Sequence, residues 1–475
     1  MLSRLYGLGR WVVSLVLALF SALCLALLLT SDRLPGGVYT AAGCLAMALW
    51  ALAVLLLGRV LRKIPAFTWV LLGAGWAISL AAALLLNPPL QSDFQMLYDA
   101  GVSWLRGDTS FQQSVYFQLW AYQSAYVAWE ALFLSIWQDP RMIELIHSLL
   151  FSGTIVLLYR LLRAQIPETA ARVTAVWMLS FPTFFTLPAV LTNQIPGAFF
   201  LCLGLWVLLS EDTRRLGLGR FPLAGLCLQL GNLMRPEGVL ILAALAAAGI
   251  LYLLTRPALW RRALLGGVLL LAAYWLAGRA ADLLVVVSGL NENGLANEDP
   301  LWKFVLGLNP ETGGTYSADD WALVVATLGP DNRMTEATVA LEKALIAQRL
   351  RQPLGSLLAL ALEKVDRLWI ADPLSWALAG LSETECWGLR TFCRAADRTL
   401  LGLALALTLP GTLLRRGHPR EARGFVPHLV VLASFFAFLL IEVQPRYAYL
   451  PLLFLFCCAG HGLALVGNRW LRWED

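Results

Sequence analysis

The sequence predicts an all-α protein, a polytopic bundle of transmembrane helices. Of its 475 residues, 59% are hydrophobic and only 14% are charged, and the mean hydropathy is +0.68. These values lie outside the range of soluble globular chains. Lipid offers no partners to backbone groups, so a helix of ~20 apolar residues is the unit that crosses it. We therefore expect one transmembrane domain over residues 1–475.

About twelve apolar segments are candidates for membrane spans. The segment 11–30 is longer than the apolar core of a signal peptide, so we expect it to be an uncleaved first span. The segments 196–210 and 221–234 are short for spans and could instead form a re-entrant hairpin. Because a hairpin would remove both spans, the sidedness of the remaining segments would not change. The segments lie near residues 11–30, 39–57, 67–87, 142–162, 169–187, 196–210, 221–234, 237–254, 262–284, 397–415, 425–442 and 447–467.

Basic residues set the expected orientation. With a cytoplasmic N-terminus, every inner connector carries Arg or Lys, as the positive-inside rule requires. The C-terminus is then cytoplasmic too, and the expected location is the plasma (inner) membrane. The residues concerned are Arg59, Arg62, Lys63, Arg160, Arg163, Arg214, Arg215, Arg220, Arg256, Arg261, Arg262, Arg415, Arg416, Arg420 and Arg423.

Two long connectors, 88–141 and 285–396, fall on the outer side in this threading. The first contains "TSFQQSVYFQLWAYQSAYVAWEALFLSIWQDP", in which aromatic residues recur at helical spacing without reaching spanning length. In the second, four charged residues interrupt the apolar run "LGSLLALALEKVDRLW". Both patterns are typical of helices that lie in the membrane interface. The charged residues are Glu363, Lys364, Asp366 and Arg367.

Two carboxylates stand where the chain leaves the third apolar segment, in "NPPLQSDFQMLYDAGVSWLRGD". Asp93 and Asp99 are six positions apart, so they would point in different directions from one helix. One interpretation is that they are solvated or, for Asp93, that it caps the helix beginning there. The other is that partial desolvation at the membrane surface raises the proton affinity of Asp93 and suits it to act as a general base.

Two Arg residues stand at Pro-broken helix junctions on the same outer side, Arg235 in "NLMRPEG" and Arg446 in "IEVQPRYAYLP". Guanidinium groups bind phosphate oxygens bidentately, so the pair could hold a lipid phosphate. Alternatively, each Arg pairs with its neighbour Glu237 or Glu442, or reaches lipid headgroups.

Two further polar residues are candidates on outer connectors. Asn193 either lines the same cavity or makes a turn before Pro196. Lys303 is either a second cation for a phosphate or a solvated surface residue. Cys386 and Cys393, in "ECWGLRTFC", share the second outer connector, where an oxidising compartment would permit a disulfide.

Several classes of protein lack support in the sequence. It contains no Walker A, His-Glu-x-x-His, Gly-x-Ser-x-Gly or Asp-x-Asp motif, and its four His residues are scattered. It also lacks the basic and aromatic pattern of nucleic-acid binding, so no nucleic-acid partner is expected. Metal ligands cannot be assigned.

A series of short motifs, taken in their order along the chain, resembles the bacterial branch of the GT-C superfamily. The motifs are "SDF", "YDAG", "LRGD", "YFQLWAYQSAYVAWEALF", "NLMRPEG", "LNPETGGTYSADD" and "IEVQPRY". These are integral-membrane glycosyltransferases that use polyprenyl-phosphate sugars. They are related to the protein O-mannosyltransferases and to the aminoarabinose transferases that modify lipid A. The resemblance runs from about residue 85 to the C-terminus.

The resemblance implies that Asp93 is the catalytic base or helps to bind a divalent metal. It also implies that Arg235 and Arg446 bind the donor phosphate. Two positions depart from the pattern, because relatives often carry a carboxylate at Asn193 and a Pro at Ala121. The expected substrate-binding residues are Asp99, Tyr116, Tyr122, Gln123, Asn193, Arg235, Glu237, Lys303, Glu442, Gln444, Arg446 and Tyr447.

The implied reaction moves a monosaccharide from a polyprenyl-phosphate donor to a glycan, lipid or protein acceptor on the extracytoplasmic face, with inversion. The alternatives are a transporter or flippase of a lipid-linked or anionic solute, and a polymerase or ligase of surface polysaccharide. A transporter would place its charges near the midplane of broken spans. In this sequence the charged residues gather at the outer ends of the apolar segments.

Overall fold

The computed structural model describes residues 2–31, 33–414 and 422–473. These residues form helices and connecting turns, with no β-strand among them, so the all-α class is confirmed. The membrane part contains α1 (Leu2–Thr30), α2 (Val38–Leu56), α3 (Gly58–Lys63), α4 (Phe67–Leu86), α8 (Pro140–Leu162), α9 (Glu168–Ser180), α10 (Pro182–Thr186), α11 (Gln194–Leu209), α12 (Arg220–Met234), α13 (Gly238–Thr255), α14 (Trp260–Val287), α19 (Trp387–Leu413), α20 (Val426–Leu440) and α21 (Tyr449–Trp470).

The expected count of twelve spans is not confirmed. In the described ranges, eight helical segments are long and apolar enough to cross a membrane, and a ninth is added if α9 and the segment Pro182–Val190, bent by 58°, count as one span. The helices α11 and α12 have only 16 and 15 residues, and the first half of α19 carries several charges. The chain is nonetheless a multi-pass membrane protein.

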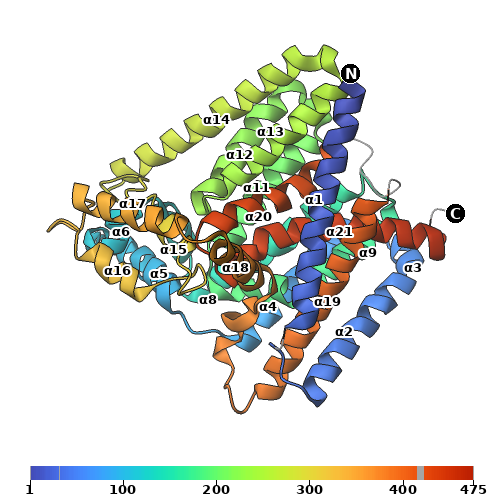
Figure 1. Cartoon of the computed structure of the whole chain (residues 1–475), viewed down its shortest axis with the longest axis horizontal. Helices are drawn as coiled ribbons and strands as arrows, with labels where there is room; N and C mark the ends of the chain where they lie inside the picture. Colours follow the sequence, from blue (N-terminus) through green and yellow to red (C-terminus); the bar gives the residue numbers. More distant parts are fainter. Residues whose placement is uncertain (1, 32, 415–421, 474–475) are drawn as a thin grey trace.

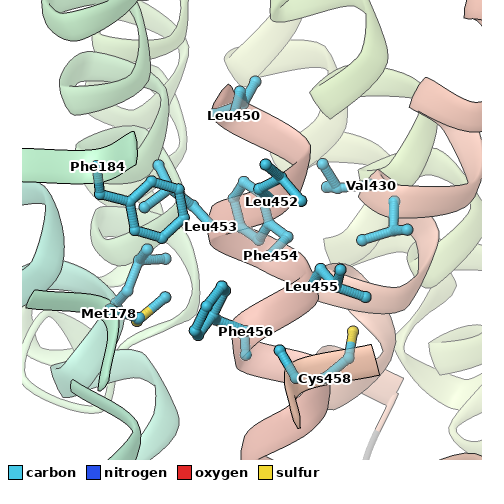
Figure 2. Packing of buried hydrophobic residues seen from close by; sticks show 14 of the residues in the cluster. Met178, Phe184, Val430, Leu450, Leu452, Leu453, Phe454, Leu455, Phe456 and Cys458 are labelled. Carbon is cyan, nitrogen blue, oxygen red and sulfur yellow. The ribbon is translucent and has the colours of Figure 1, made fainter. Parts of the chain in front are cut away.

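The core forms around α21, which is buried along most of its length. Its Phe456 ring lies 5.0 Å from the Phe181 ring and 5.4 Å from the Phe184 ring, between centroids. Figure 2 shows Phe456 and Phe184 from close by, with Leu453 and Met178 near them. By contrast, α14 runs along one edge of the bundle and exposes Trp275 and Leu284, as a lipid-facing helix does.

Small residues let neighbouring helices approach closely. A Cβ atom added at Gly231 of α12 would lie 2.9 Å from the carbonyl oxygen of Gly197 on α11. One added at Gly462 of α21 would collide with that of Leu407 on α19. Such contacts are typical of membrane helix pairs, in which close backbone packing drives association.

Short helices fill both long connectors. The first holds α5 (Ser92–Leu105), α6 (Val115–Leu119) and α7 (Ser124–Leu134), and the second holds α15 (Trp302–Gly307), α16 (Ala318–Val325), α17 (Glu336–Leu350) and α18 (Leu354–Val365). Helices of both connectors gather at the left of Figure 1, and the two chain ends lie toward the right.

The two connectors pair through their backbones. The Tyr122 amide donates to the carbonyl of Ala296 at 3.0 Å, and the Glu298 amide donates to that of Leu119 at 2.9 Å. The side chain of Asn291 also donates to the Ser124 hydroxyl at 3.1 Å. Both connectors therefore lie on the same side of the helix bundle.

Several basic connectors also meet. An Nη of Arg160, near the end of α8, lies 3.2 Å from an Oδ of Asp212, and Arg423 pairs with Glu211. Arg59 donates to the carbonyl of Arg472 at 2.6 Å. Arg415, Arg416 and Arg420 of the predicted basic set lie outside the described residues.

Lys364 of α18 differs from its expected place on an exposed amphipathic helix. It is 1% exposed, and its Nζ donates to the carbonyls of Gly307, Leu439 and Ile441 at 2.6, 2.9 and 2.9 Å. An ammonium group has three donors, and here all three are used. Lys364 thus ties the second connector to the end of α20.

Replacing Lys364 with Met should lower the free energy of unfolding by about 1–3 kcal/mol, because buried carbonyls would lose their donor. Thermal melting of the purified protein in detergent measures the effect. The matched control is Lys343→Met, because Lys343 is exposed on α17. Equal melting temperatures for the two variants would contradict the role given to Lys364.

Cysteine labelling tests the sidedness. In a cysteine-free background, Ser110→Cys and Asp319→Cys should both react with a membrane-impermeant reagent outside sealed cells, because both positions are exposed on the paired connectors. Arg215→Cys, exposed on a basic connector, should react only after the membrane is opened. Outside labelling of position 215 would reverse the orientation.

Candidate active site

Helix ends from distant parts of the chain converge on one group of side chains. Asp93 lies in the first turn of α5, Asn193 immediately precedes α11, and Arg235 immediately follows α12. Arg446 lies in a short 3-10 helix, η10 (Pro445–Ala448), between α20 and α21. Pro236 and Pro445 cannot donate a backbone hydrogen bond, which helps to end or redirect the helix at both junctions.

The predicted base and a predicted phosphate-binding residue are neighbours. An Nη of Arg446 lies 3.6 Å from an Oδ of Asp93. The Arg446 Nε donates to Gln444 at 2.8 Å, and its guanidinium carbon lies 4.6 Å from the centre of the Phe94 ring. The Arg446 side chain is 8% exposed and that of Asp93 is 43% exposed. Asp93 is therefore open to solvent, and the desolvation expected for it is not found.

Arg235 lies on the other side of this group. Its Nε is 2.6 Å from an Oε of Glu237, and an Nη donates to Asn193 at 3.4 Å. The amide of Asn193 in turn donates to Gln123 at 3.4 Å. Burial disfavours the charge of Arg235, but Glu237, Tyr447 and Tyr122 together outweigh this effect and raise the pKa of Arg235.

Tyr447 joins the two Arg residues. The guanidinium carbons of Arg235 and Arg446 lie 4.4 and 5.4 Å from the centre of its ring, so they are at most 9.8 Å apart, the sum of these distances. Cations stacked on an aromatic ring keep their charge with less hydration. Two guanidinium groups therefore share one aromatic support.

Glu442 organises the adjoining part of the site. It is 2% exposed and lies 2.5 Å from the Lys303 Nζ. It accepts from Gln444 at 2.9 Å and from the Tyr447 hydroxyl at 3.2 Å. Burial acts to raise the pKa of Glu442, but Lys303, Gln444 and Arg446 together outweigh burial and lower it. Lys303 is thus fixed by an ion pair, and its side chain is still 41% exposed.

Two tyrosines of the first connector face the same charges. Burial raises the pKa of Tyr116, and Asp93 adds to the effect. Burial also raises that of Tyr122, with Lys303 opposing it. Both phenols therefore stay protonated near neutral pH. The Tyr116 hydroxyl is buried and has no hydrogen-bond partner in the described part of the chain, so it is free to donate to a ligand.

Asp99 lies apart from this group. It is exposed on α5, where the Gln95 amide donates to it at 2.8 Å. Asp93 does not act as the N-cap that one interpretation allowed, because Gln91 holds the N-cap position without a side-chain hydrogen bond. Asp93 instead lies in the first turn, where the helix dipole favours a carboxylate.

Sequence reasoning missed three contributors. Gln194 donates to the carbonyl of Arg446, and the rings of Phe94 and Trp376 contact the Arg446 guanidinium. Phe94 had a signal, because it belongs to the "SDF" motif. Trp376 is distant in the sequence and has none.

The described side chains do not form a site for a divalent metal. No three His, Cys, Asp or Glu residues among them come together as ligands. The three carboxylates of the group are each paired with a cation, Asp93 with Arg446, Glu237 with Arg235 and Glu442 with Lys303. We therefore derive no step through a metal.

The disulfide expected between Cys386 and Cys393 is not formed, and both thiols are free. Cys386 is the N-cap residue of α19 and Cys393 lies seven positions on. At ~1.5 Å per residue they are about 10 Å apart along the helix. A disulfide needs Cα atoms within roughly 7 Å.

Residues 125–280 match the sequence model of the family described as dolichyl-phosphate-mannose-protein mannosyltransferase. No curated protein matches. Among solved structures, the chain is similar to the archaeal oligosaccharyltransferase AglB from Archaeoglobus fulgidus, in complex with an inhibitory peptide and a dolichol-phosphate.

The similarity to AglB has a TM-score of 0.48 at 15% identity and covers 86% of this chain. The chain spans about half of the length of AglB, 51%. The matched family segment contains Asn193, Arg235 and Glu237 of the site. The family match confirms, over residues 125–280 of this multi-pass membrane protein, the resemblance indicated by the motifs.

Proposed function

We propose that the protein transfers a monosaccharide from a polyprenyl-phosphate donor to an acceptor at the extracytoplasmic face of the plasma (inner) membrane, with inversion. The observation that carries the proposal is the pairing of Asp93 with Arg446 at 3.6 Å, next to Arg235 on the shared Tyr447 ring. A base and two phosphate-binding cations thus occupy one site at the ends of membrane helices.

In this proposal Arg235 and Arg446 hold the donor phosphate. Guanidinium groups match phosphate oxygens in bidentate geometry. Their carboxylate partners, Glu237 and Asp93, orient them before the donor arrives. Lys303, held by Glu442 and partly exposed, adds a third positive charge. The Tyr116 hydroxyl is available to bind a phosphate or sugar oxygen.

Asp93 removes a proton from an acceptor hydroxyl, and that oxygen attacks the anomeric carbon from the face opposite the phosphate. The bond between the anomeric carbon and the phosphate oxygen breaks, and its electron pair stays on the phosphate. The proton remains on Asp93 until solvent takes it, which the exposure of this carboxylate allows. Fixed guanidinium charges stabilise the developing negative charge on the leaving phosphate.

Replacing Asp93 with Asn should reduce turnover by ~10²- to 10⁴-fold while donor affinity changes little, because the amide keeps the shape and loses the basicity. Single-turnover transfer by the purified protein, with donor binding measured separately, tests this. Asp99→Asn, on the exposed part of α5, is the matched control. Transfer at the wild-type rate by Asp93→Asn would remove the base from the proposal.

Replacing Arg446 with Ala should instead weaken donor binding by about 10- to 100-fold, the value of a charged hydrogen bond to phosphate. Calorimetric titration with a short-chain polyprenyl phosphate gives the affinity. Arg351→Ala, at an exposed position after α17, should bind as the wild type does. Unchanged affinity in Arg446→Ala would place the donor phosphate elsewhere.

A further inference from the structure

A cavity adjoins the candidate active site. It has a volume of about 290 Å³ and lies between the end of α1, the turn that follows α18, α19 and α21. Pro445, the residue before Arg446, lines it. On the same side, Pro373 and Asp372 line it, three and four residues before the Trp376 that contacts Arg446. The cavity and the site thus share one wall.

Three guanidinium groups line this cavity, and two of them are neutralised. Arg33 pairs with Asp366, and the Nε of Arg394 lies 2.5 Å from an Oδ of Asp372. The third is Arg398, whose Nη2 donates to the carbonyl of Leu28 at 3.0 Å and to the hydroxyl of Ser31 at 2.9 Å. Both of these partners are neutral.

The hydrogen bonds of Arg398 thus leave its charge unpaired, and Asp397 and Asp372 of the same lining attract it without forming an ion pair. Arg398 forms no ion pair with any residue that the structure describes. Its neighbour Asp397 accepts from the amide and the hydroxyl of Thr183, both at 2.8 Å. Arg33 is near enough to repel Arg398. An anion bound in the cavity would relieve this repulsion and use the remaining donors of the guanidinium.

The rest of the lining is largely apolar. Leu34, Phe181, Leu401 and Leu452 contribute to the wall, and the cavity lies beside the end of α1, a membrane-spanning helix. Leu29, close by on α1, is 77% exposed, as a residue facing lipid chains would be. The cavity therefore combines a cationic part with an apolar part next to the bilayer, which fits the head of an amphiphile.

We propose that this cavity binds the acidic head of a lipid-borne acceptor, with Arg398 as its anion-binding residue. The assignment to the acceptor rests on the proposed function, because a transferase needs two substrate sites and Arg235 and Arg446 take the donor phosphate. The shared wall then brings the acceptor's hydroxyl-bearing part toward Asp93.

The test uses the purified full chain and dioctanoyl phosphatidic acid as the probe, titrated calorimetrically. To remove the donor site, the titration is done in the Arg446→Ala background, where the probe should still bind with an affinity within about threefold of the wild type. Adding Arg398→Gln should weaken binding by about 10- to 100-fold. Arg398→Lys, which keeps the charge, should recover part of this loss, and Arg351→Gln should have no effect.

A second variant leaves all charges in place, so that the proposal can still be tested if Arg398→Gln does not fold. Leu401→Trp fills the cavity and should also abolish binding, with an unchanged elution volume on size exclusion. Dioctanoyl phosphatidylcholine should not compete. Failure of millimolar inorganic phosphate to compete shows that the site needs the lipid as well as the anion, and full competition would overturn the lipid-borne assignment.

Three results would overturn the proposal: loss of binding on Arg446→Ala alone, binding unaffected by both Arg398→Gln and Leu401→Trp, or one-for-one displacement of the probe by a short-chain polyprenyl phosphate. The proposed function fails separately. If no sugar transfer is measured while the probe still binds through Arg398, the cavity is an acidic-lipid site and the proposed transferase activity is wrong.

Discussion

The structure of the site depends on one constraint: a charge withdrawn from water at a membrane helix end must have a partner. Three ion pairs meet this constraint around the Tyr447 ring, Asp93 with Arg446, Glu237 with Arg235 and Lys303 with Glu442. Arg446 and Glu442 are buried, and leaving either of them unpaired would cost several kcal/mol, so their pairs restrict where the helices can end. The same pairs leave cationic groups oriented toward a common space.

The constraint also explains why the two long connectors are structured. Asp93, Arg235 and Glu442 are each contacted by a residue of another segment, Arg446, Asn193 and Lys303, so loose connectors could not maintain the geometry. Backbone hydrogen bonds join the connectors at Tyr122 and Glu298. Lys364 secures the second connector to the end of α20, two residues before Glu442. Support for the site thus reaches well beyond the residues that would touch a substrate.

Much of this arrangement could be predicted from the sequence. Hydropathy and helical periodicity depend on local composition, so the helical class and the helices at all twelve apolar segments followed from them. The number of spans could not be predicted in this way, because the hydropathy of α11, α12 and α19 does not tell whether their apolar faces pack against other helices or face lipid. Asp93, Arg235 and Arg446 were identifiable from their positions at helix junctions. The contacts of Trp376 and Lys364, and the direction of Asp99, depend on tertiary packing between segments far apart in the sequence.

The backbone pairing of the two connectors has a consequence for biosynthesis. A ribosome delivers the chain from its N-terminus, so the first connector is made while its partner segment around residue 296 is still missing. Arg446 and Tyr447 follow about 150 residues later still. The two halves of the site are thus separated in time as well as in sequence, and the centre stays incompetent until the last helices are inserted.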